Sequence, residues 1–463
     1  MSDTGAPLRL RFDAQVEIAD EGRLLIGGTG GRVLRITDAA STLVRGWRDG
    51  AEVGPAPVER SLARRLIDSG FAHPVYASGP YGLSDLTVVI PVLDDADGVA
   101  AVVESLDTRL AVVVVDDGSA DPSAVVRAAG RASVLRRDEP GGPAAARELG
   151  RTAVRTPLTA FVDADCVPAT GWLDALLPHF ADPAVAAVAP RVRSRPGASL
   201  LDRYEVVRSP LDLGGDPATV RPLTRVSYVP SACLVVRSDV PAFDPGLRYG
   251  EDVDLVWRVI AEGGAVRYEP AAEAWHRPRP SWRAWWRQRR SYGSSAAPLA
   301  RRHPGSAVPA VLDRRTGVPW ALVAIGRPAA GLAAAVVVAD RLRRTLGGLG
   351  VDGTRAVRLV LRGQLVTGRW LATATTRSWW PLALTLGALH RRSRLPLAAA
   401  VLGPAVADWR RSRPDIDPVR YVALRLADDI AYGVGLWAGC RTEGSIRALV
   451  PGFTRRSSSM SPD

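Results

Sequence analysis

Four aspartates occur as two pairs, each directly after an apolar run of the chain. Asp116 and Asp117 follow the run AVVVV, and Asp163 and Asp165 follow LTAFV. A turn with two carboxylates suits a hard divalent cation, because Mg²⁺ and Mn²⁺ take oxygen ligands from one or two carboxylates and complete their shell with phosphate and water. Such a cation would neutralise a leaving diphosphate. The alternative is that these aspartates only cap the helices that follow.

A third acidic cluster, Glu251 and Asp252, opens a segment with helical periodicity. Apolar residues recur from Val253 to Ile260 at i, i+3, i+4 and i+7 spacing, which predicts one buried helix face. The two acids then lie at the helix N-terminus, where the helix dipole favours an ionised carboxylate. An ionised aspartate there is a candidate general base, and an ordinary helix cap is the alternative.

Buried strands must position these acids. Short apolar runs alternate with helical stretches after Leu86, which is typical of an α/β sheet with parallel strands. The predicted strands are LTVVIPV, AVVVVD, SVLRR and LTAFVDAD, and the helical stretches include GVAAVVESL and PAAARELGRTAV. Ligands bind at the carboxyl ends of strands in such sheets, so the aspartate pairs lie where we expect chemistry.

Six segments, taken together, resemble the ordered signature of inverting family 2 glycosyltransferases of GT-A fold. They are VVIPV, VVVVDDGS, GGPAAAREL, FVDADC, FDPGLRYGEDVDLVWRV and AEAWH. Their order and spacing are far more specific than a single Asp-x-Asp. The resemblance implies a nucleotide-sugar-binding domain over residues 83–280. The chain departs from the family at Leu93-Asp94, where Tyr-Asn or Asn is frequent, and at Glu148, where Asn often follows the Ala-Arg pair.

The resemblance also implies which residues hold the donor. Asp117 would contact the nucleotide base or ribose, and Asp165 would bind Mg²⁺ or Mn²⁺ with support from Asp163. The residues implied at the donor are Asp116, Asp117, Arg147 and Asp163. The implied metal ligands are Asp163, Asp165 and His276.

Catalysis is implied to depend on Asp252, beside Glu251, as the base that deprotonates the acceptor hydroxyl. In an inverting transferase the base and the metal act on opposite faces of the anomeric carbon in a single displacement. No covalent nucleophile is needed, so Cys166 is interpreted as a packed thiol.

Residues 1–82 are predicted to form a separate winged-helix-like module of short strands and helices. Its arginines are scattered among acids, so no nucleic-acid partner is expected. The segments RLLIGGTGGRVLRIT and ARRLIDSGFAHP resemble PqqD-like peptide-recognition modules, which bind a peptide as an extra strand at a sheet edge.

A peptide-recognition module fused to a family 2 glycosyltransferase resembles the mycofactocin-system glycosyltransferases. That family implies transfer of glucose from UDP-glucose onto a peptide-derived redox cofactor, the mycofactocin precursor, with growth of a β-1,4-linked chain. The residues by themselves indicate only hexosyl transfer. Two alternatives are a processive cell-surface polysaccharide synthase, whose QxxRW motif reads QRRSY here, and a non-catalytic scaffold that binds nucleotide and peptide.

The 463-residue chain carries its whole positive charge on arginine. Basic residues outnumber acidic ones 60 to 48, lysine is absent, and the net charge is +12. Three widely spaced cysteines fit a reducing compartment. Residues 281–315 hold eight arginines together with Trp282, Trp285 and Trp286, which predicts an amphipathic segment at an anionic membrane surface. A stacking floor for acceptor sugars is the alternative.

Residues 316–452 are predicted to be helical and membrane-associated, on the cytoplasmic face of the cell membrane, with the cytoplasm as the alternative location. Their apolar stretches all fall short of the ~18 uninterrupted residues of a simple spanning helix. A tilted span from Thr316 to Ala339 and a soluble helical bundle are the alternatives. Residues 453–463 are predicted to be a disordered tail.

Overall fold

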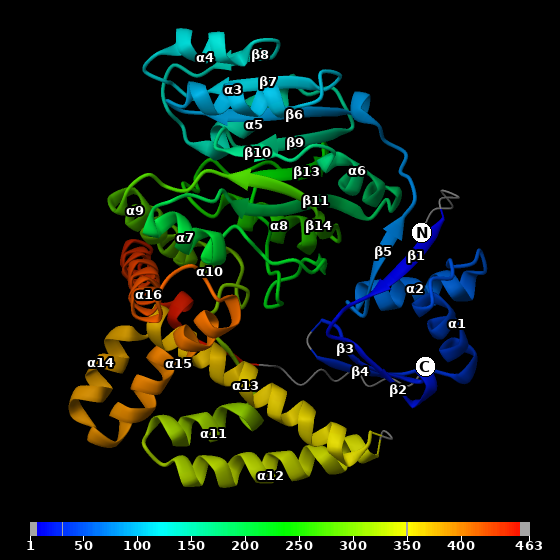
Figure 1. The fold of residues 1–463 in the computed structure, drawn as a ribbon, viewed down its shortest axis with the longest axis vertical. Helices are drawn as coiled ribbons and strands as arrows, with labels where there is room; N and C mark the ends of the chain where they lie inside the picture. Colours follow the sequence, from blue (N-terminus) through cyan, green and yellow to red (C-terminus); the bar gives the residue numbers. More distant parts are fainter. Residues whose placement is uncertain (1–6, 30, 349–350, 454–463) are drawn as a thin grey trace. The chain divides into compact units, whose positions relative to one another are not determined.

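The computed structural model describes residues 7–29, 31–348 and 351–453 (Figure 1). The chain divides into two units. The first unit contains the residues up to 198 together with 208–278, and the second contains residues 199–207 and those from 279 onward.

The N-terminal part of the first unit, blue in Figure 1, has its own hydrophobic core. Leu25, Val44, Leu66 and Phe71 are fully or almost fully buried in this core. Its elements are β1 (Leu8–Phe12), β2 (Glu17–Ala19), β3 (Leu24–Gly27), β4 (Arg32–Arg35), α1 (Asp38–Arg48), α2 (Pro57–Asp68) and β5 (Ala72–Tyr76). β1 pairs with β5, and β2, β3 and β4 form an antiparallel sheet. The segments LRLRFDAQVEI and RLLIGGTGGRVLRI predict β1 to β4, and VERSLARRLID predicts α2, whereas α1 and β5 were not predicted from the sequence.

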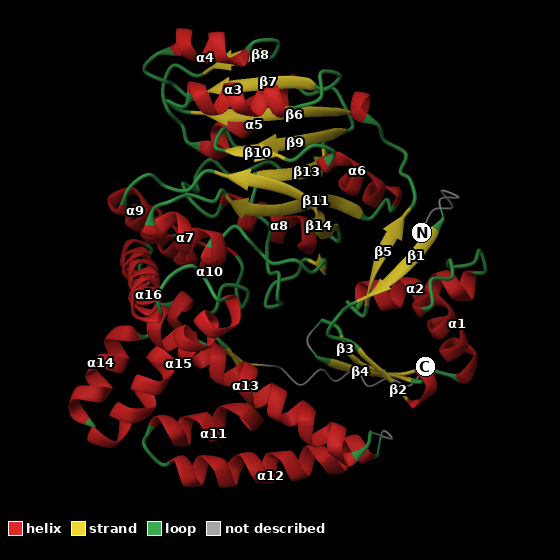
Figure 2. Ribbon diagram, in the orientation of Figure 1, coloured by secondary structure: helices red, strands yellow, loops and turns green. Residues whose placement is uncertain are grey.

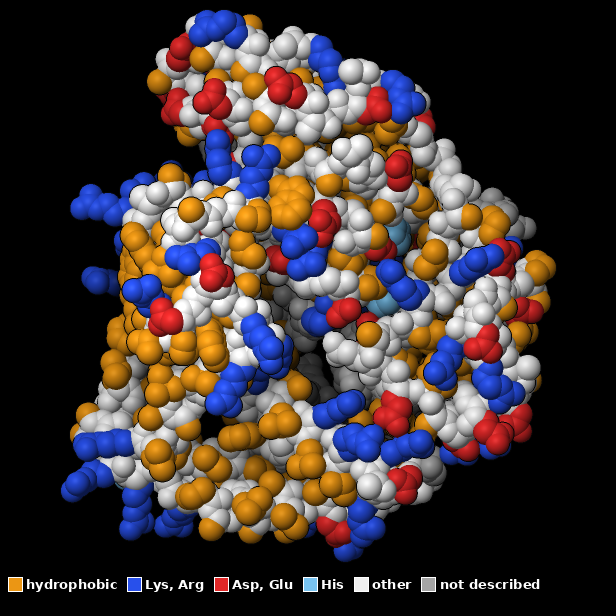
Figure 3. All heavy atoms as spheres, viewed as in Figure 1, with side chains coloured by type: hydrophobic (Ala, Val, Ile, Leu, Met, Phe, Trp, Pro, Cys, Tyr) orange, Lys and Arg blue, Asp and Glu red, His pale blue; other side chains and the backbone are white. Residues whose placement is uncertain are grey.

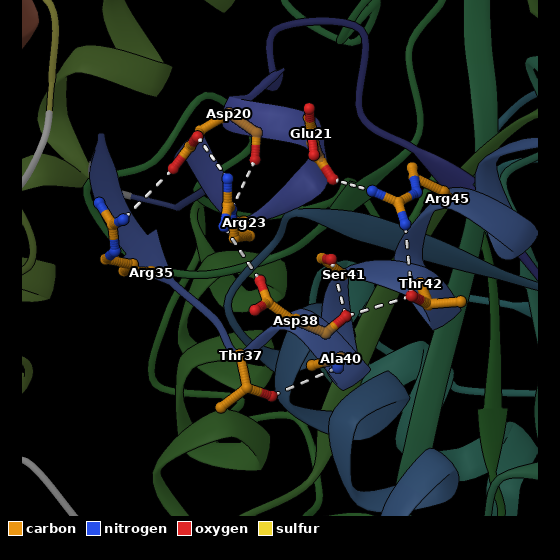
Figure 4. A network of polar contacts seen from close by, with 10 residues as sticks. All are labelled: Asp20, Glu21, Arg23, Arg35, Thr37, Asp38, Ala40, Ser41, Thr42 and Arg45. Atoms are coloured by element: carbon orange, nitrogen blue, oxygen red, sulfur yellow. Dashed lines mark hydrogen bonds and ion pairs between the residues drawn. The ribbon is translucent and has the colours of Figure 1, made fainter.

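Acidic side chains pair with the arginines of this N-terminal part (Figure 4). Asp20 lies between Arg23 and Arg35, at 3.2 and 3.3 Å, and Arg23 also donates to Asp38 at 3.2 Å. Thr37 caps α1 by accepting a hydrogen bond from the backbone N–H of Ala40. These arginines are therefore engaged within the module.

The remainder of the first unit contains, within the described residues, a mixed nine-stranded sheet (Figure 2). Its main strand order is β10-β14-β11-β13-β9-β6-β7-β8, and β12 pairs with β14. The strands are β6 (Leu86–Val92), β7 (Ala111–Asp116), β8 (Ser133–Arg136), β9 (Leu158–Val162), β10 (Cys166–Pro168), β11 (Val185–Ser194), β12 (Ala218–Thr219), β13 (Cys233–Arg237) and β14 (Ala265–His276).

The four strands that the sequence analysis predicted are parallel to one another, and β11 and β14 form a further parallel pair elsewhere in the sheet. β9, β6, β7 and β8 run parallel, so Asp116 and Asp163 follow strands that end at the same edge. β13 runs antiparallel between β9 and β11, which corrects the prediction of an all-parallel sheet. This pairing joins segments far apart in the chain, and the local apolar pattern does not encode it.

Helices cover the sheet and begin at recognisable caps. Asp95 and Asp121 cap α3 and α4, while Pro143 is the first residue of α5. The helices are α3 (Ala96–Ser105), α4 (Pro122–Ala129), α5 (Pro143–Ala153), α6 (Trp172–Leu176) and α8 (Glu251–Ala261). Apolar side chains of α3, α4 and α6 join those of the strands in one core.

The second unit begins with helices held together by buried charges. Arg289 pairs with Glu205 and Asp428, and Trp285 donates to Glu205 at 2.8 Å. The elements are α7 (Leu200–Arg208), α9 (Trp282–Ser294), α10 (Ala296–Arg302) and β15 (Val311–Leu312). Trp285 is 1% exposed, whereas Trp282 and Trp286 are exposed. The expectation that all three tryptophans face a membrane is therefore wrong for Trp285.

The remaining helices of the second unit pack against one another. They are α11 (Arg314–Ala324), α12 (Pro328–Gly347), α13 (Gly353–Arg377), α14 (Trp380–Leu389), α15 (Arg394–Ser412) and α16 (Pro418–Thr442). β16 (Gly452–Phe453) pairs with β15. The alternative of one tilted helix from Thr316 to Ala339 is wrong, because the chain turns at Gly326 between α11 and α12. The tail predicted from 453 lies, from residue 454, outside the described residues.

Across the described residues, no helix combines the length and apolar character that crossing a membrane would take.

Candidate active site

Arg147 joins the acidic turn after β9 to the acidic start of α8. Its Nη2 donates to Asp163 Oδ1 at 2.6 Å, and its Nη1 donates to Glu251 Oε1 at 2.9 Å. The guanidinium is buried. Burial disfavours the charge, but the carboxylates of Asp163 and Glu251 outweigh it and raise the pKa of Arg147. A permanent positive charge therefore holds two acidic segments together.

Asp252 is the second residue of α8. Gly250, just before the helix, has a φ of +78°, a left-handed conformation that glycine adopts without strain. One oxygen of Asp252 accepts a hydrogen bond from the N–H of Val253 at 2.8 Å, and the other faces the N–H of Ser231 at 3.4 Å. Burial raises the pKa of Asp252 to about 7, and the charge of Glu251 acts in the same direction. A carboxylate that titrates near neutral pH is suited to proton transfer.

The loop before β13 contacts both acidic segments. Ala232 O accepts a hydrogen bond from the N–H of Asp163 at 3.0 Å, while its neighbour Ser231 faces Asp252. The antiparallel pairing sets this contact, because Cys233 lies opposite Val162. Asp163 and Asp252 therefore both contact the same two-residue segment, Ser231 and Ala232. Nothing in the sequence analysis identified Ser231 or Ala232.

Asp165 and His276 form a second pair on neighbouring strands. β10 pairs with β14 so that Cys166 lies opposite His276. His276 Nε2 lies 3.4 Å from Asp165 Oδ2, and His276 Nδ1 is buried without a hydrogen-bond partner. An oxygen and an imidazole nitrogen at this separation can bind one divalent cation.

Asp163 adds negative charge next to this pair. Burial raises the pKa of Asp163 although Arg147 opposes the shift, and the charge of Asp165 raises it further. A cation beside these carboxylates would relieve their repulsion. Within the described ranges, no three His, Cys, Asp or Glu residues are grouped so as to hold a metal ion. Asp165 and His276 by themselves leave coordination positions open, which a phosphate ligand and water would fill.

A glycine allows α3 to approach the turn that carries these acids. A Cβ atom on Gly98 would lie 2.4 Å from the carbonyl oxygen of Ala164, closer than real contacts allow. The N-terminal turn of α3 therefore packs directly on the backbone between Asp163 and Asp165.

The two aspartates at the end of β7 organise the neighbouring loops. Asp116 accepts a hydrogen bond from the N–H of Ser119 at 2.8 Å and pairs with Arg136. Burial opposes its ionisation, but these hydrogen bonds prevail and lower the pKa of Asp116. Asp116 is therefore a buried structural anion, and its predicted contact with the donor stays a prediction.

Asp117 ties the end of β7 to the glycine turn before α5. Its carboxylate accepts hydrogen bonds from the N–H groups of Gly141 and Gly142, at 2.7 to 3.1 Å, and pairs with Arg137 at 2.8 Å. The same turn leads into the helix that carries Arg147. Asp117 is thus linked through the glycine turn to the acidic site, and Arg137 is a residue that the sequence analysis missed.

Glu148 explains one departure from the family pattern. Its Oε1 accepts a hydrogen bond from the N–H of Phe243 at 2.7 Å and pairs with Arg151 at 3.1 Å. Arg151 also donates to three backbone carbonyls, those of Ser238, Val240 and Pro241. The Phe243 ring lies 5.3 Å from the guanidinium carbon of Arg147. Glu148 and Arg151 therefore hold the segment that leads toward α8.

Comparison with known proteins agrees with this geometry. The model of the family described as glycosyl transferase family 2 matches residues 87–224, which contain both aspartate pairs and Arg147. The pre-mycofactocin glycosyltransferase of Mycobacterium tuberculosis is 41% identical over 460 residues, covering 96% of this chain and 97% of its own. This chain belongs to the pre-mycofactocin glycosyltransferases of family 2. It is therefore a glycosyltransferase of the mycofactocin system.

Two less similar proteins match a smaller part of this pre-mycofactocin glycosyltransferase. The succinoglycan biosynthesis protein ExoU of Rhizobium meliloti is 33% identical over 211 residues, covering 40% of this chain and 59% of its own. The mannosyltransferase PcManGT from Pyrobaculum calidifontis, solved with GDP-Man and Mn²⁺, is 18% identical with a TM-score of 0.38. That match covers 62% of this chain and 89% of PcManGT.

Proposed function

We propose that this enzyme transfers glucose from UDP-glucose onto a peptide-derived redox cofactor, the mycofactocin precursor, with inversion and with the aid of a divalent metal ion. One observation carries the site assignment. Arg147 bridges Asp163 and Glu251, so the turn that would hold the metal and the residue beside the candidate base share one guanidinium.

The acceptor hydroxyl would give its proton to Asp252. The oxygen that faces Ser231 at 3.4 Å is the more weakly engaged of the two, so we assign the proton transfer to Oδ2. As the proton leaves, the acceptor oxygen displaces the nucleotide in a single step from the opposite face of the sugar. Arg147 does not contact the acceptor in this proposal. It holds Glu251, and thereby positions the first turn of α8, which carries Asp252.

Asp165 and His276 would hold Mg²⁺ or Mn²⁺, and the bound ion would supply positive charge to neutralise the departing diphosphate. Asp163 would support this site while it stays paired with Arg147. On the nucleotide side, Asp117 and the glycine turn that it orders would line the base or ribose.

The acceptor assignment rests on family membership. The curated relatives are pre-mycofactocin glycosyltransferases. A peptide-derived acceptor would suit the N-terminal module if that module adds a peptide strand to a sheet edge, as the PqqD-like modules that it resembles do. Repeated transfer to the previous glucose would build the β-1,4-linked chain.

The test is to incubate the full chain with several UDP-sugars, Mg²⁺ or Mn²⁺, and precursor or mature peptide cofactor. Mass spectrometry should show increments of one hexose with UDP-glucose. D165A and D252N should lose this transfer, whereas E104Q, which changes an exposed acid of α3, should retain it. Full activity in both site variants would refute the assignment. A hexose that appears only with another UDP-sugar would replace glucose as the donor and leave the site standing.

A further inference from the structure

Large apolar side chains lie uncovered on three successive helices of the second unit. Six of them, two on each of α12, α13 and α14, are between 58% and 69% exposed. Leu332 and Val336 on α12, and Leu361 and Leu365 on α13, are four residues apart and so share one face of their helix, whereas Leu382 and Leu384 are two residues apart on the short helix α14. We call these six residues the apolar surface. Contiguous exposed apolar patches on a folded protein mark contacts with a partner or a membrane. Figure 3 shows hydrophobic side chains gathered over this part of the chain, with Arg side chains at the margins.

The spacing on α13 separates an apolar stripe from a basic one. Val357, Leu361 and Leu365 follow one another at four-residue intervals and so lie on one helix face. Arg358 and Arg362 are exposed and lie one position further along the helix. A leucine stripe bordered by arginines is the arrangement of a helix that lies in a lipid interface, with its guanidinium groups reaching the phosphates.

The charge of the whole chain is concentrated on the same helices. Residues 314–412, from α11 to α15, contain 16 arginines and three aspartates, a net charge of +13. The full chain carries +12, so the rest of the protein is close to neutral. The partner of this surface must therefore be anionic and must also accept leucine side chains. A bilayer with anionic headgroups meets both conditions, whereas nucleic acid offers phosphates but no place for the leucines.

We propose that α12, α13 and α14 dock this enzyme on an anionic lipid bilayer, at the cytoplasmic face of the cell membrane, with the helices lying in the interface. The apolar surface enters the headgroup region, and exposed arginines beside it, such as Arg358 and Arg362, contact lipid phosphates. The docking element is thus not the Arg- and Trp-rich segment 281–315, in which Trp285 and Arg289 are buried. This inference is independent of the donor and acceptor proposed above.

The test is sedimentation of the full chain with vesicles of phosphatidylcholine alone or with about one quarter phosphatidylglycerol. The enzyme should bind the anionic vesicles, and raised salt should weaken this binding. The variants L361Q/L365Q and R358Q/R362Q should each lower the affinity by about tenfold or more. Both should keep their transfer of hexose without vesicles, because these residues lie outside the catalytic site.

Matched controls change exposed residues of the first unit. V58Q replaces a valine of α2 that is 74% exposed, and R127Q replaces an exposed arginine of α4. Both should bind anionic vesicles like the unchanged chain. Equal binding of all variants would overturn the proposal, as would failure of the unchanged chain to bind. If the unchanged chain forms a dimer, does not bind lipid, and loses the dimer in L361Q/L365Q, the partner of this surface would be a second copy of the chain, which would overturn the proposal. Binding of an RNA probe in place of vesicles, with an affinity that L361Q/L365Q does not change, would also contradict a lipid bilayer as the partner.

Discussion

Arg147 lies 2.9 Å from Glu251, although 104 residues separate them in the chain. The contact links the helix after the glycine turn to the helix that carries the candidate base. Because the same guanidinium also pairs with Asp163, removing it would leave two buried or half-buried carboxylates facing each other.

Replacement of Arg147 by Met should destabilise the fold and alter catalysis. Breaking a buried ion pair by removing one partner costs about 3–5 kcal/mol. Arg147 also lowers the pKa of Asp252, so its loss should move the pH profile of any remaining activity to higher pH. Denaturant unfolding and a pH series measure the two effects. R147K, which keeps the charge but not both hydrogen bonds, should show a smaller shift in the profile than R147M.

The pH dependence of transfer should follow Asp252. Burial and Glu251 raise the pKa of Asp252 to about 7, and a general base works only when it is ionised. Activity should therefore fall by about tenfold per pH unit below 7 and level off above it. The measurement is kcat/KM for the acceptor across this range. D252N should lose about 10² to 10⁴ in rate and show no such ascending limb. An unchanged limb in D252N would assign the titration to another group.

Glu148 should act by positioning Phe243 and the segment before α8. E148A removes the acceptor of the Phe243 N–H and the partner of Arg151, so kcat should fall by about tenfold or more while KM for the donor changes little. E148Q keeps an acceptor oxygen and should retain most of the activity. Steady-state kinetics distinguish the two, with E104A as the exposed control. Equal losses in E148A and E104A would contradict this role.

Removal of divalent metal should abolish transfer, and added Mg²⁺ or Mn²⁺ should restore it. In H276A the metal concentration for half-maximal activity should rise by about tenfold or more, because one of the two proposed ligands is lost. H390A changes an exposed histidine of the second unit and should not alter metal activation. Full activity of the unchanged enzyme in excess chelator would contradict a metal-dependent reaction.

Cys166 and Cys233 should resist alkylation in the folded enzyme. Burial raises the pKa of both thiols, and the charge of Asp163 adds to the effect. Iodoacetamide at mildly alkaline pH should leave both unmodified, and denaturant should make both reactive. Peptide mass mapping gives the result. Rapid modification of Cys166 in the native state would contradict its interpretation as a packed thiol.

Much of the site could be predicted from local pattern. The predicted strand AVVVVD ends at Asp116, as β7 does, and the apolar run LTAFV ends at Val162, as β9 does, although the predicted strand LTAFVDAD extended three residues further. Strand length and burial follow from a few consecutive side chains. The helix that begins at Glu251 was predictable for the same reason, since its periodicity and its acidic first turn are contained within eleven residues.

The sequence by itself therefore determined which residue types stand at the ends of strands and helices. Only the tertiary structure decided which charges meet. Arg147 contacts Glu251 across 104 residues, and Ser231 reaches Asp252 because β13 pairs antiparallel with β9. Likewise, the burial of Trp285 depends on Glu205, 80 residues earlier. Such contacts depend on how distant segments of the chain pack together. A hydrophobic period repeats over only a few residues, so the local pattern does not predict these long-range contacts.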